Sequence, residues 1–66
     1  MFKNGDKVIL PNEKIGEVEK IGEVVDLETF RFLTGNKSVS IPRGKVCVAV
    51  DGGFSFFLPT ELNKVA

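Results

Sequence analysis

Alternation of apolar and polar residues predicts short β-strands along most of this 66-residue chain. The first strand covers residues 7–10, with Val8 and Leu10 on one face and Ile9 on the other. Pro11 follows directly and ends the strand, because proline lacks the N–H group that strand pairing requires.

The next apolar residues belong to a tandem six-residue repeat, KIGEVE followed by KIGEVV, over residues 14–25. They fall three residues apart, at Ile15, Val18, Ile21 and Val24. This spacing is compatible with a helix face, but each glycine inside a helix costs about 1 kcal/mol, and β-branched residues favour strands. We therefore expect one long, bent strand in which Gly22 marks a bulge that reverses the facing pattern.

The middle of the chain predicts an insertion. Residues 29–33 alternate again, which places Phe30 and Phe32 on one face of a predicted strand. Turn-forming residues separate this strand from a second short one at residues 38–41. We expect a long loop or hairpin insertion over about residues 26–43, and no helix longer than one turn anywhere in the chain.

The last third predicts a β-hairpin, a short 3-10 turn at Pro59–Leu62 and a final strand. The length of the hairpin loop decides which side chains share a face. A two-residue loop would place Val46, Val48 and Val50 beside Ser55 and Phe57. A three-residue loop, Asp51-Gly52-Gly53, instead collects six apolar side chains on one face: Val46, Val48, Val50, Phe54, Phe56 and Leu58. We favour the three-residue loop, which leaves Phe57 on the outer face with Cys47, Ala49 and Ser55.

Composition limits the chemistry. The length allows one domain, covering residues 1–66, with a small core. Without histidine and with the single cysteine Cys47, the sequence favours neither a zinc site nor an imidazole base nor an internal disulfide. We predict no catalytic residue, no metal site and no cofactor. No apolar run approaches the roughly 18 residues that span a bilayer, so we expect a soluble, cytoplasmic protein, of bacterial or phage origin given its size.

Charge is balanced overall but unevenly distributed. Residues 12–28 hold six acids and two lysines, a balance of −4, whereas residues 29–50 hold four bases and no acid, a balance of +4. The two segments either neutralise each other as neighbours in the sheet or form a dipolar surface that selects a partner. Both interpretations stay open at this point.

Three stretches carry a resemblance to SH3-like barrels: GDKVIL at residues 5–10, IGEV at 15–18 and FFLPTELNKV at 56–65. The resemblance covers most of the chain outside the insertion and implies an all-β barrel of about five strands. Peptide-binding SH3 domains use Trp and Tyr, which this chain lacks. It also resembles the four-copy plasmid-borne dihydrofolate reductase, but Ser55 and Phe57 stand where that enzyme family keeps its ligand-binding Gln and Tyr.

Two further similarities suggest functions without catalysis. Gly5–Val8 and Gly16–Val18 are similar to the pattern of KOW-type modules, which implies contact with nucleic acid or with the transcription and translation machinery. Small SH3-like accessory and phage proteins also share the pattern, and the stromal-side subunit of photosystem I is one of them. Their resemblance implies binding to a larger protein or complex.

We therefore expect a non-catalytic interaction module, most consistent with a small accessory protein that binds a larger protein. A KOW-like nucleic-acid-binding module is the alternative, and a self-associating barrel is the second alternative. The candidate binding residues are Arg31, Lys37, Arg43, Lys45 and Phe57. Phe57, assisted by Leu33, would supply apolar contact, and the four bases would face an acidic partner. In the alternative that stays open, the insertion folds back over Phe57 and makes it part of the core, and the four bases are solvated surface.

Overall fold

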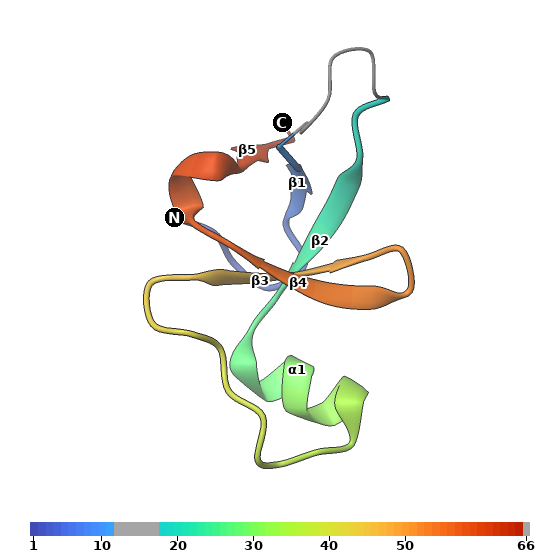
Figure 1. Ribbon diagram of the computed structural model, residues 1–66, viewed down its shortest axis with the longest axis vertical. Coiled ribbons are helices and arrows are strands. Elements are labelled where there is room, and N and C mark those ends of the chain that lie inside the picture. The colour runs from blue at the N-terminus through green and yellow to red at the C-terminus, as the bar shows by residue number, and fades with distance from the viewer. Residues whose placement is uncertain (12–17, 66) are drawn as a thin grey trace.

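The computed structural model describes residues 1–11 and 18–65, which form one antiparallel sheet with strand order β4-β3-β2-β1-β5 (Figure 1). The strands are β1 (Lys7–Ile9), β2 (Ile21–Val25), β3 (Val46–Val50), β4 (Gly53–Phe57) and β5 (Asn63–Lys64). The helix α1 (Leu27–Thr34) follows β2, and a 3-10 turn (Pro59–Glu61) joins β4 to β5. The mostly-β composition and the turn before the last strand confirm the prediction. Because β4 and β5 lie at opposite edges, the sheet is open and is not a closed barrel.

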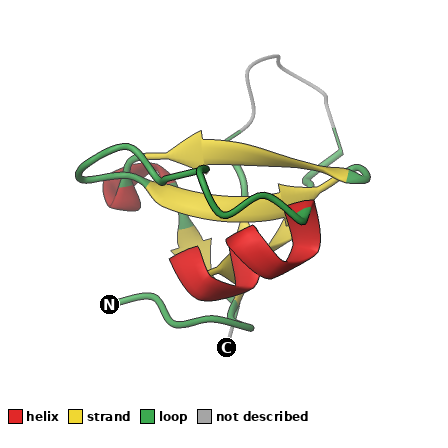
Figure 2. Cartoon of the chain, turned by 90° about the horizontal axis from the view of Figure 1, so that it is seen from below, coloured by secondary structure: helices red, strands yellow, loops and turns green. Residues whose placement is uncertain are grey.

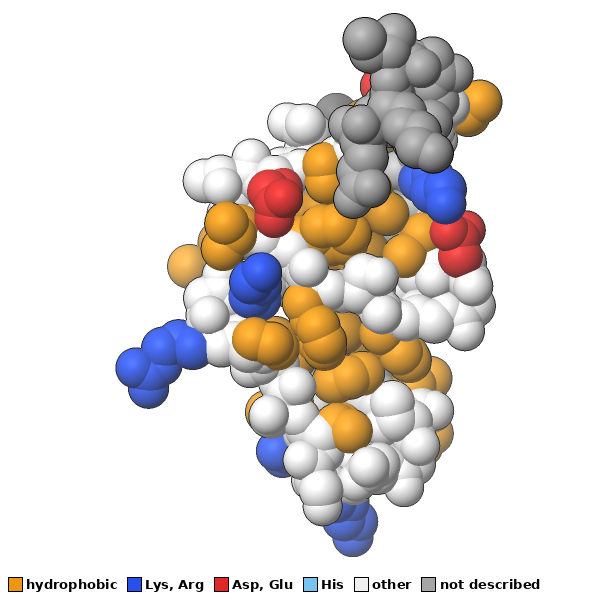
Figure 3. Space-filling view, in the orientation of Figure 1, with side chains coloured by type: hydrophobic (Ala, Val, Ile, Leu, Met, Phe, Trp, Pro, Cys, Tyr) orange, Lys and Arg blue, Asp and Glu red, His pale blue; other side chains and the backbone are white. Residues whose placement is uncertain are grey.

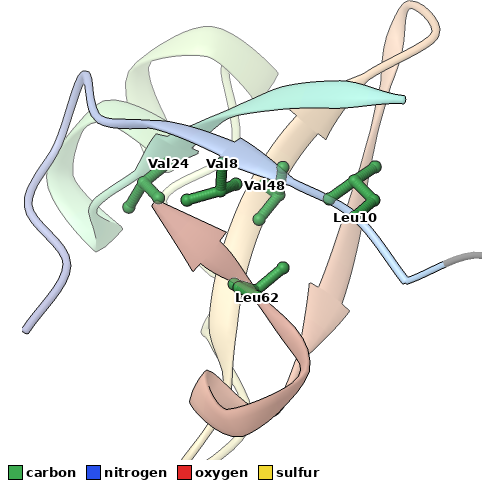
Figure 4. Packing of buried hydrophobic residues seen from close by; sticks show 5 residues of the cluster. All are labelled: Val8, Leu10, Val24, Val48 and Leu62. Carbon is green, nitrogen blue, oxygen red and sulfur yellow. The ribbon is translucent and has the colours of Figure 1, made fainter. Parts of the chain in front are cut away.

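The main core lies on the inner face of the sheet (Figure 4). Its buried side chains come from β1 and the residue after it, from β2 and β3, and from the residue after the 3-10 turn: Val8, Leu10, Val24, Val48 and Leu62. Val8 and Leu10 therefore share a buried face, as their spacing predicts. Phe2, Val46, Val50 and Phe57 pack against this cluster as partly buried residues.

A second core lies on the outer face, where α1 covers β2, β3 and β4. Figure 2 looks onto this side, with α1 in front of the strands. Phe30 of α1 is buried with Val25 and Cys47. Its ring meets Phe54 edge-on with 4.9 Å between centroids, and it meets Phe56 at 5.8 Å. The aromatic contacts fasten the helix to β4.

The helix corrects the prediction for residues 26–43. The Asp26 carboxylate accepts a hydrogen bond from the Thr29 backbone N–H (2.8 Å), and Gly35 ends the helix in the left-handed conformation with φ of 66°. Both are typical helix caps, and together they outweigh the five-residue alternation that predicted a strand. Residues 38–41 are loop and do not form the predicted second strand. The expectation of no helix beyond one turn is therefore wrong.

The closing hairpin corrects the predicted register. Val50 pairs with Gly53, Val48 with Ser55 and Val46 with Phe57, so the loop has two residues, Asp51 and Gly52. Both loop residues have positive φ, 52° and 75°, which is the type I′ geometry that suits the strand twist.

The preference for a three-residue loop assumed that only one face of the hairpin is buried. Because α1 buries part of the outer face, the apolar side chains divide between the two cores. Phe57 points to the inner core, contrary to the prediction, whereas Phe54 and Phe56 lie on the outer face against Phe30. Leu58, predicted in the core, is 46% exposed.

Gly22 is not a bulge. Its pairing with Val8 continues without interruption from Lys7 opposite Glu23 to Ile9 opposite Ile21. The strand β2 begins at Ile21, so it is shorter than predicted; the first repeat falls largely on residues 12–17, which lie outside the described residues. A Cβ at Gly22 would overlap Val48 Cγ1 and lie 3.1 Å from the Ala49 carbonyl oxygen. Glycine is required here for close packing across the core.

Gly22→Ala should therefore destabilise the protein by about 1–3 kcal/mol, because the fully buried Val48 side chain cannot move aside. Urea unfolding followed by circular dichroism measures this. Gly53→Ala is the matched control: a Cβ there meets nothing within 4 Å, so the free energy of unfolding should hardly change. Equal stability of the two variants would contradict the packing argument.

The Asp26 cap predicts a pH dependence. The hydrogen bond from the Thr29 N–H lowers the pKa of the Asp26 carboxyl, and the Lys3 N–H does the same for the pKa of Asp6. A carboxyl group whose pKa is lower in the folded state stabilises the fold at pH values above its unfolded-state pKa. This stabilisation is lost as the pH falls through the folded-state pKa. Urea unfolding should show stability decreasing below about pH 4.

Asp26→Asn separates the two carboxyl groups. Asparagine caps a helix about as well as aspartate, so stability at pH 7 should stay close to that of the parent protein. The loss on acidification should become smaller, and Asp6 should account for what remains. An unchanged pH profile in Asp26→Asn would show that this cap does not titrate with folding.

Candidate functional site

The exposed side of α1 carries Phe32, the most exposed aromatic side chain among the described residues. Successive helical residues are about 100° apart, so Phe32 lies about 200° around the helix from Phe30 and faces away from the sheet when Phe30 faces it. Phe32 is 81% exposed and Leu33 is 55% exposed. The predicted strand would have placed Phe30 and Phe32 together, and the helix separates them.

Two bases flank Phe32. Arg31, Phe32, Gly35 and Lys37 line a shallow pocket of about 300 Å³. Gly35 produces this proximity, because its left-handed conformation turns the chain at the end of α1 and lets Lys37 return beside Arg31. We call these four residues together with Leu33 the α1 surface.

The Arg31 side chain is held in place. Its Nε donates a hydrogen bond to the Val39 carbonyl oxygen at 3.0 Å, which ties the loop after α1 back to the helix. The bond uses one of the five N–H donors of the guanidinium group. Arg31 therefore serves the fold and still presents positive charge beside Phe32.

The structure brings together two of the five predicted site residues, Arg31 and Lys37. Arg43 is exposed in a turn that the Lys45 N–H closes by donating to the Pro42 carbonyl oxygen (3.0 Å). Lys45 lines a different pocket, and Phe57 is half-buried in the inner core. The predicted surface is therefore divided, and Phe32 occupies the place beside the bases that the prediction assigned to Phe57.

The pocket at Lys45 has a volume of about 370 Å³ and is mostly apolar. It lies between the N-terminal segment and the ends of β2 and β3, with Asp26 and Lys45 among its lining residues. Cys47 also lines it, but burial raises the pKa of this thiol. A protonated, buried thiol is a packing group and a poor nucleophile.

Among the described residues, the ion pairs do not join the acidic segment to the basic segment. The three ion pairs seen among the described residues join Lys7 to Glu23, Lys20 to Asp51 (2.8 Å) and Lys64 to Asp6 (3.3 Å). None of these three links an acid of residues 12–28 to a base of residues 29–50. None of the three pairs includes any of the four bases that precede β3: Arg31, Lys37, Arg43 and Lys45.

Phe32 is the residue that the sequence argument missed as a candidate contact. The signal was present: Asp26 and Gly35 stand where an N-cap and a C-terminal glycine bracket eight helical residues, with Glu28 in the first turn. These caps predict a helix, and a helix places Phe32 on the side away from Phe30.

The described residues contain neither a cluster of metal-binding side chains nor a membrane-spanning helix. Within residues 1–11 and 18–65, no three His, Cys, Asp or Glu side chains gather where they could hold a metal ion. Over the same part of the chain, no helix has the length and apolar character needed to cross a membrane.

Comparison of the chain with protein-family models, with curated proteins and with solved structures finds no match in any of the three.

Proposed function

We propose that the protein is a non-catalytic interaction module of SH3-like architecture whose α1 surface binds an acidic segment of a larger protein. The order of a hairpin, a 3-10 turn and a short final strand supports the SH3-like assignment, because small five-stranded barrels are commonly built in this order. The open sheet and the helix α1 are what this chain adds to that plan.

The exposed Phe32 ring carries the proposal. Burying a phenylalanine side chain contributes about 1.5–3 kcal/mol to folding stability. Because Phe32 is 81% exposed, the fold gains little of this stabilisation from its ring. Phe30, two residues earlier, already anchors the helix to the sheet. Phe32 thus stands on a helix that Phe30 fixes to the sheet, while its own ring is left for a partner, and aromatic residues of this kind often act as interface anchors.

The charge around the ring indicates the partner's chemistry. Arg31 and Lys37 share the pocket with Phe32, and residues 29–50 contain four bases and no acid. A segment with one apolar side chain flanked by Asp or Glu would fill the pocket and meet both bases. Charges at the rim of such a contact act mainly on specificity and association rate.

A defined peptide pair tests this function. A synthetic peptide with a central Leu flanked by glutamates should bind weakly, with a dissociation constant above about 1 µM. The same peptide with lysines in place of the glutamates should not bind. In two-dimensional NMR spectra, the shifted amides should be those of the α1 surface. Shifts elsewhere, or equal binding of both peptides, would contradict the proposal.

Phe32→Ala should weaken this binding about tenfold or more while the melting temperature stays unchanged. Leu58→Ala is the matched control, because Leu58 is also an exposed apolar residue (46%) but lies after β4 and outside the α1 surface. Equal effects of both variants would show that exposed apolar area in general, and not the α1 surface, binds the peptide.

The same ring favours one alternative. An exposed aromatic side chain beside two cations can also stack on a base of single-stranded nucleic acid, as a KOW-like function would require. Such binding should be strong at about 50 mM salt and fall steeply as salt rises, because phosphate contacts release counterions. A single-stranded oligonucleotide that binds without this salt dependence, or not at all, would remove the alternative.

A further inference from the structure

The outer edge of β4 offers unpaired backbone. β4 ends the sheet and lies toward the viewer in Figure 1. In a hairpin with a two-residue loop, the residues flanking the loop form a hydrogen-bonded pair, and such pairs then alternate along the ladder. Ser55 and Phe57 therefore bond to β3. The N–H and C=O groups of Phe54 and Phe56 point away from β3, to the open edge.

Within the described residues, this edge carries neither a charged side chain nor a bulge. Residues 52–59 contain no charged side chain, and β4 pairs with β3 over five positions without a bulge. Single-domain proteins commonly guard such edges with Lys, Pro or a bulge. In the orientation of Figure 1, hydrophobic side chains lie above and below the level where β4 crosses the molecule (Figure 3).

The edge closes just beyond the strand. The Glu61 carboxylate accepts the Leu58 N–H at 2.8 Å, so this donor is used within the chain. Pro59 follows and has no N–H to offer. The open run is therefore limited to the five residues Gly53–Phe57.

We propose that a second copy of this chain occupies the edge, with the two β4 strands antiparallel about a twofold axis at Ser55. The register then pairs every residue of the open run. Phe54 lies opposite the partner's Phe56 in a hydrogen-bonded pair, and Phe57 lies opposite the partner's Gly53, which leaves space for its ring. The half-exposed rings of Phe54 and Phe56 then form two facing pairs across the axis.

Charge does not oppose the antiparallel pairing of two copies. At the loop end of the hairpin, Asp51 is paired with Lys20 at 2.8 Å, so the loop brings no unbalanced acid to the other copy. Residues 52–59 hold no charged side chain, so no like charges of this stretch face each other across the twofold axis.

A second copy also suits the energetics and the geometry. The described residues hold only eight buried hydrophobic side chains, a small core for an independent domain. The twofold axis uses both β4 edges, so the assembly closes as a dimer and does not extend into a fibre. The result is a continuous sheet that runs through both copies.

Sedimentation equilibrium over about 1 µM to 1 mM protein tests the dimer. The unmodified protein should show a reversible monomer–dimer equilibrium. Phe56→Lys places a charge at the edge and should weaken dimerisation at least about tenfold. Phe32→Lys introduces the same charge on α1 and should leave dimerisation unchanged. A monomer at every concentration, or equal effects of the two variants, would overturn the proposal.

Two measurements protect the test against misfolding of Phe56→Lys, since this residue contacts Phe30. A chain of this length can be made synthetically with an N-methyl group on the Phe56 amide, which removes one edge donor and keeps the side chain. It should be folded and monomeric; a folded dimer would overturn the proposal.

Hydrogen exchange gives the second measurement. The amides of Phe54 and Phe56 should become protected as the protein concentration rises, whereas the amides of Ser55 and Phe57 should be protected throughout. Protection of all four at low concentration, or of none of the first two at high concentration, would contradict the edge pairing. This dimer and the α1 surface fail independently, because Phe56 variants address the first and Phe32 variants the second.

Discussion

Burial of the middle of β3 on both faces is the constraint on which the architecture depends. Val48 is fully buried on the inner face and its neighbour Cys47 is 1% exposed on the outer face. A strand buried on both sides needs cover on both sides, and its side chains read as a continuous apolar run, VCVAV. The inner cover comes from β1, β2 and the residues after β4. The outer cover comes from α1.

This double burial explains features that are otherwise unrelated. Gly22 lacks a side chain because Val48 needs the space on the inner side. The hairpin can place Phe54 and Phe56 outward because Phe30 covers them there. The loop after α1 is fixed by Arg31, whose bond to Val39 keeps the helix cover and the loop together. Each feature keeps water away from one face of β3.

The two surfaces proposed to bind partners, the α1 surface and the β4 edge, are those that the core does not bury. A helix of eight residues has one face for Phe30, so Phe32 must turn outward, beside the two bases that the αL turn at Gly35 assembles. In the same way, the sheet must end somewhere, and it ends on β4, the strand with the most aromatic side chains. Binding by the α1 surface and pairing at the β4 edge therefore use different parts of one supporting sheet.

The sequence by itself determined the local features whose cause is local. Alternation placed Val8 and Leu10 on one face, proline and the turn residues located the 3-10 turn, and Asp51-Gly52-Gly53 located the hairpin, although its loop consists of only the first two of these residues. It did not determine the helix over 27–34, because the alternation of residues 29–33 has the period of a strand and the caps at Asp26 and Gly35 had to be weighed against it.

Only the tertiary structure decided on which side each residue of the closing hairpin faces. Counting apolar residues on one face favours the longer loop if a single face is buried. Once α1 covers the other face, the count no longer discriminates, and the twist-matched two-residue loop is preferred. Phe57 consequently faces the core and Phe32 the solvent. The sequence shows which residues are apolar. Whether each lies in the core or at the surface depends on the helix α1, the second layer that packs against the sheet.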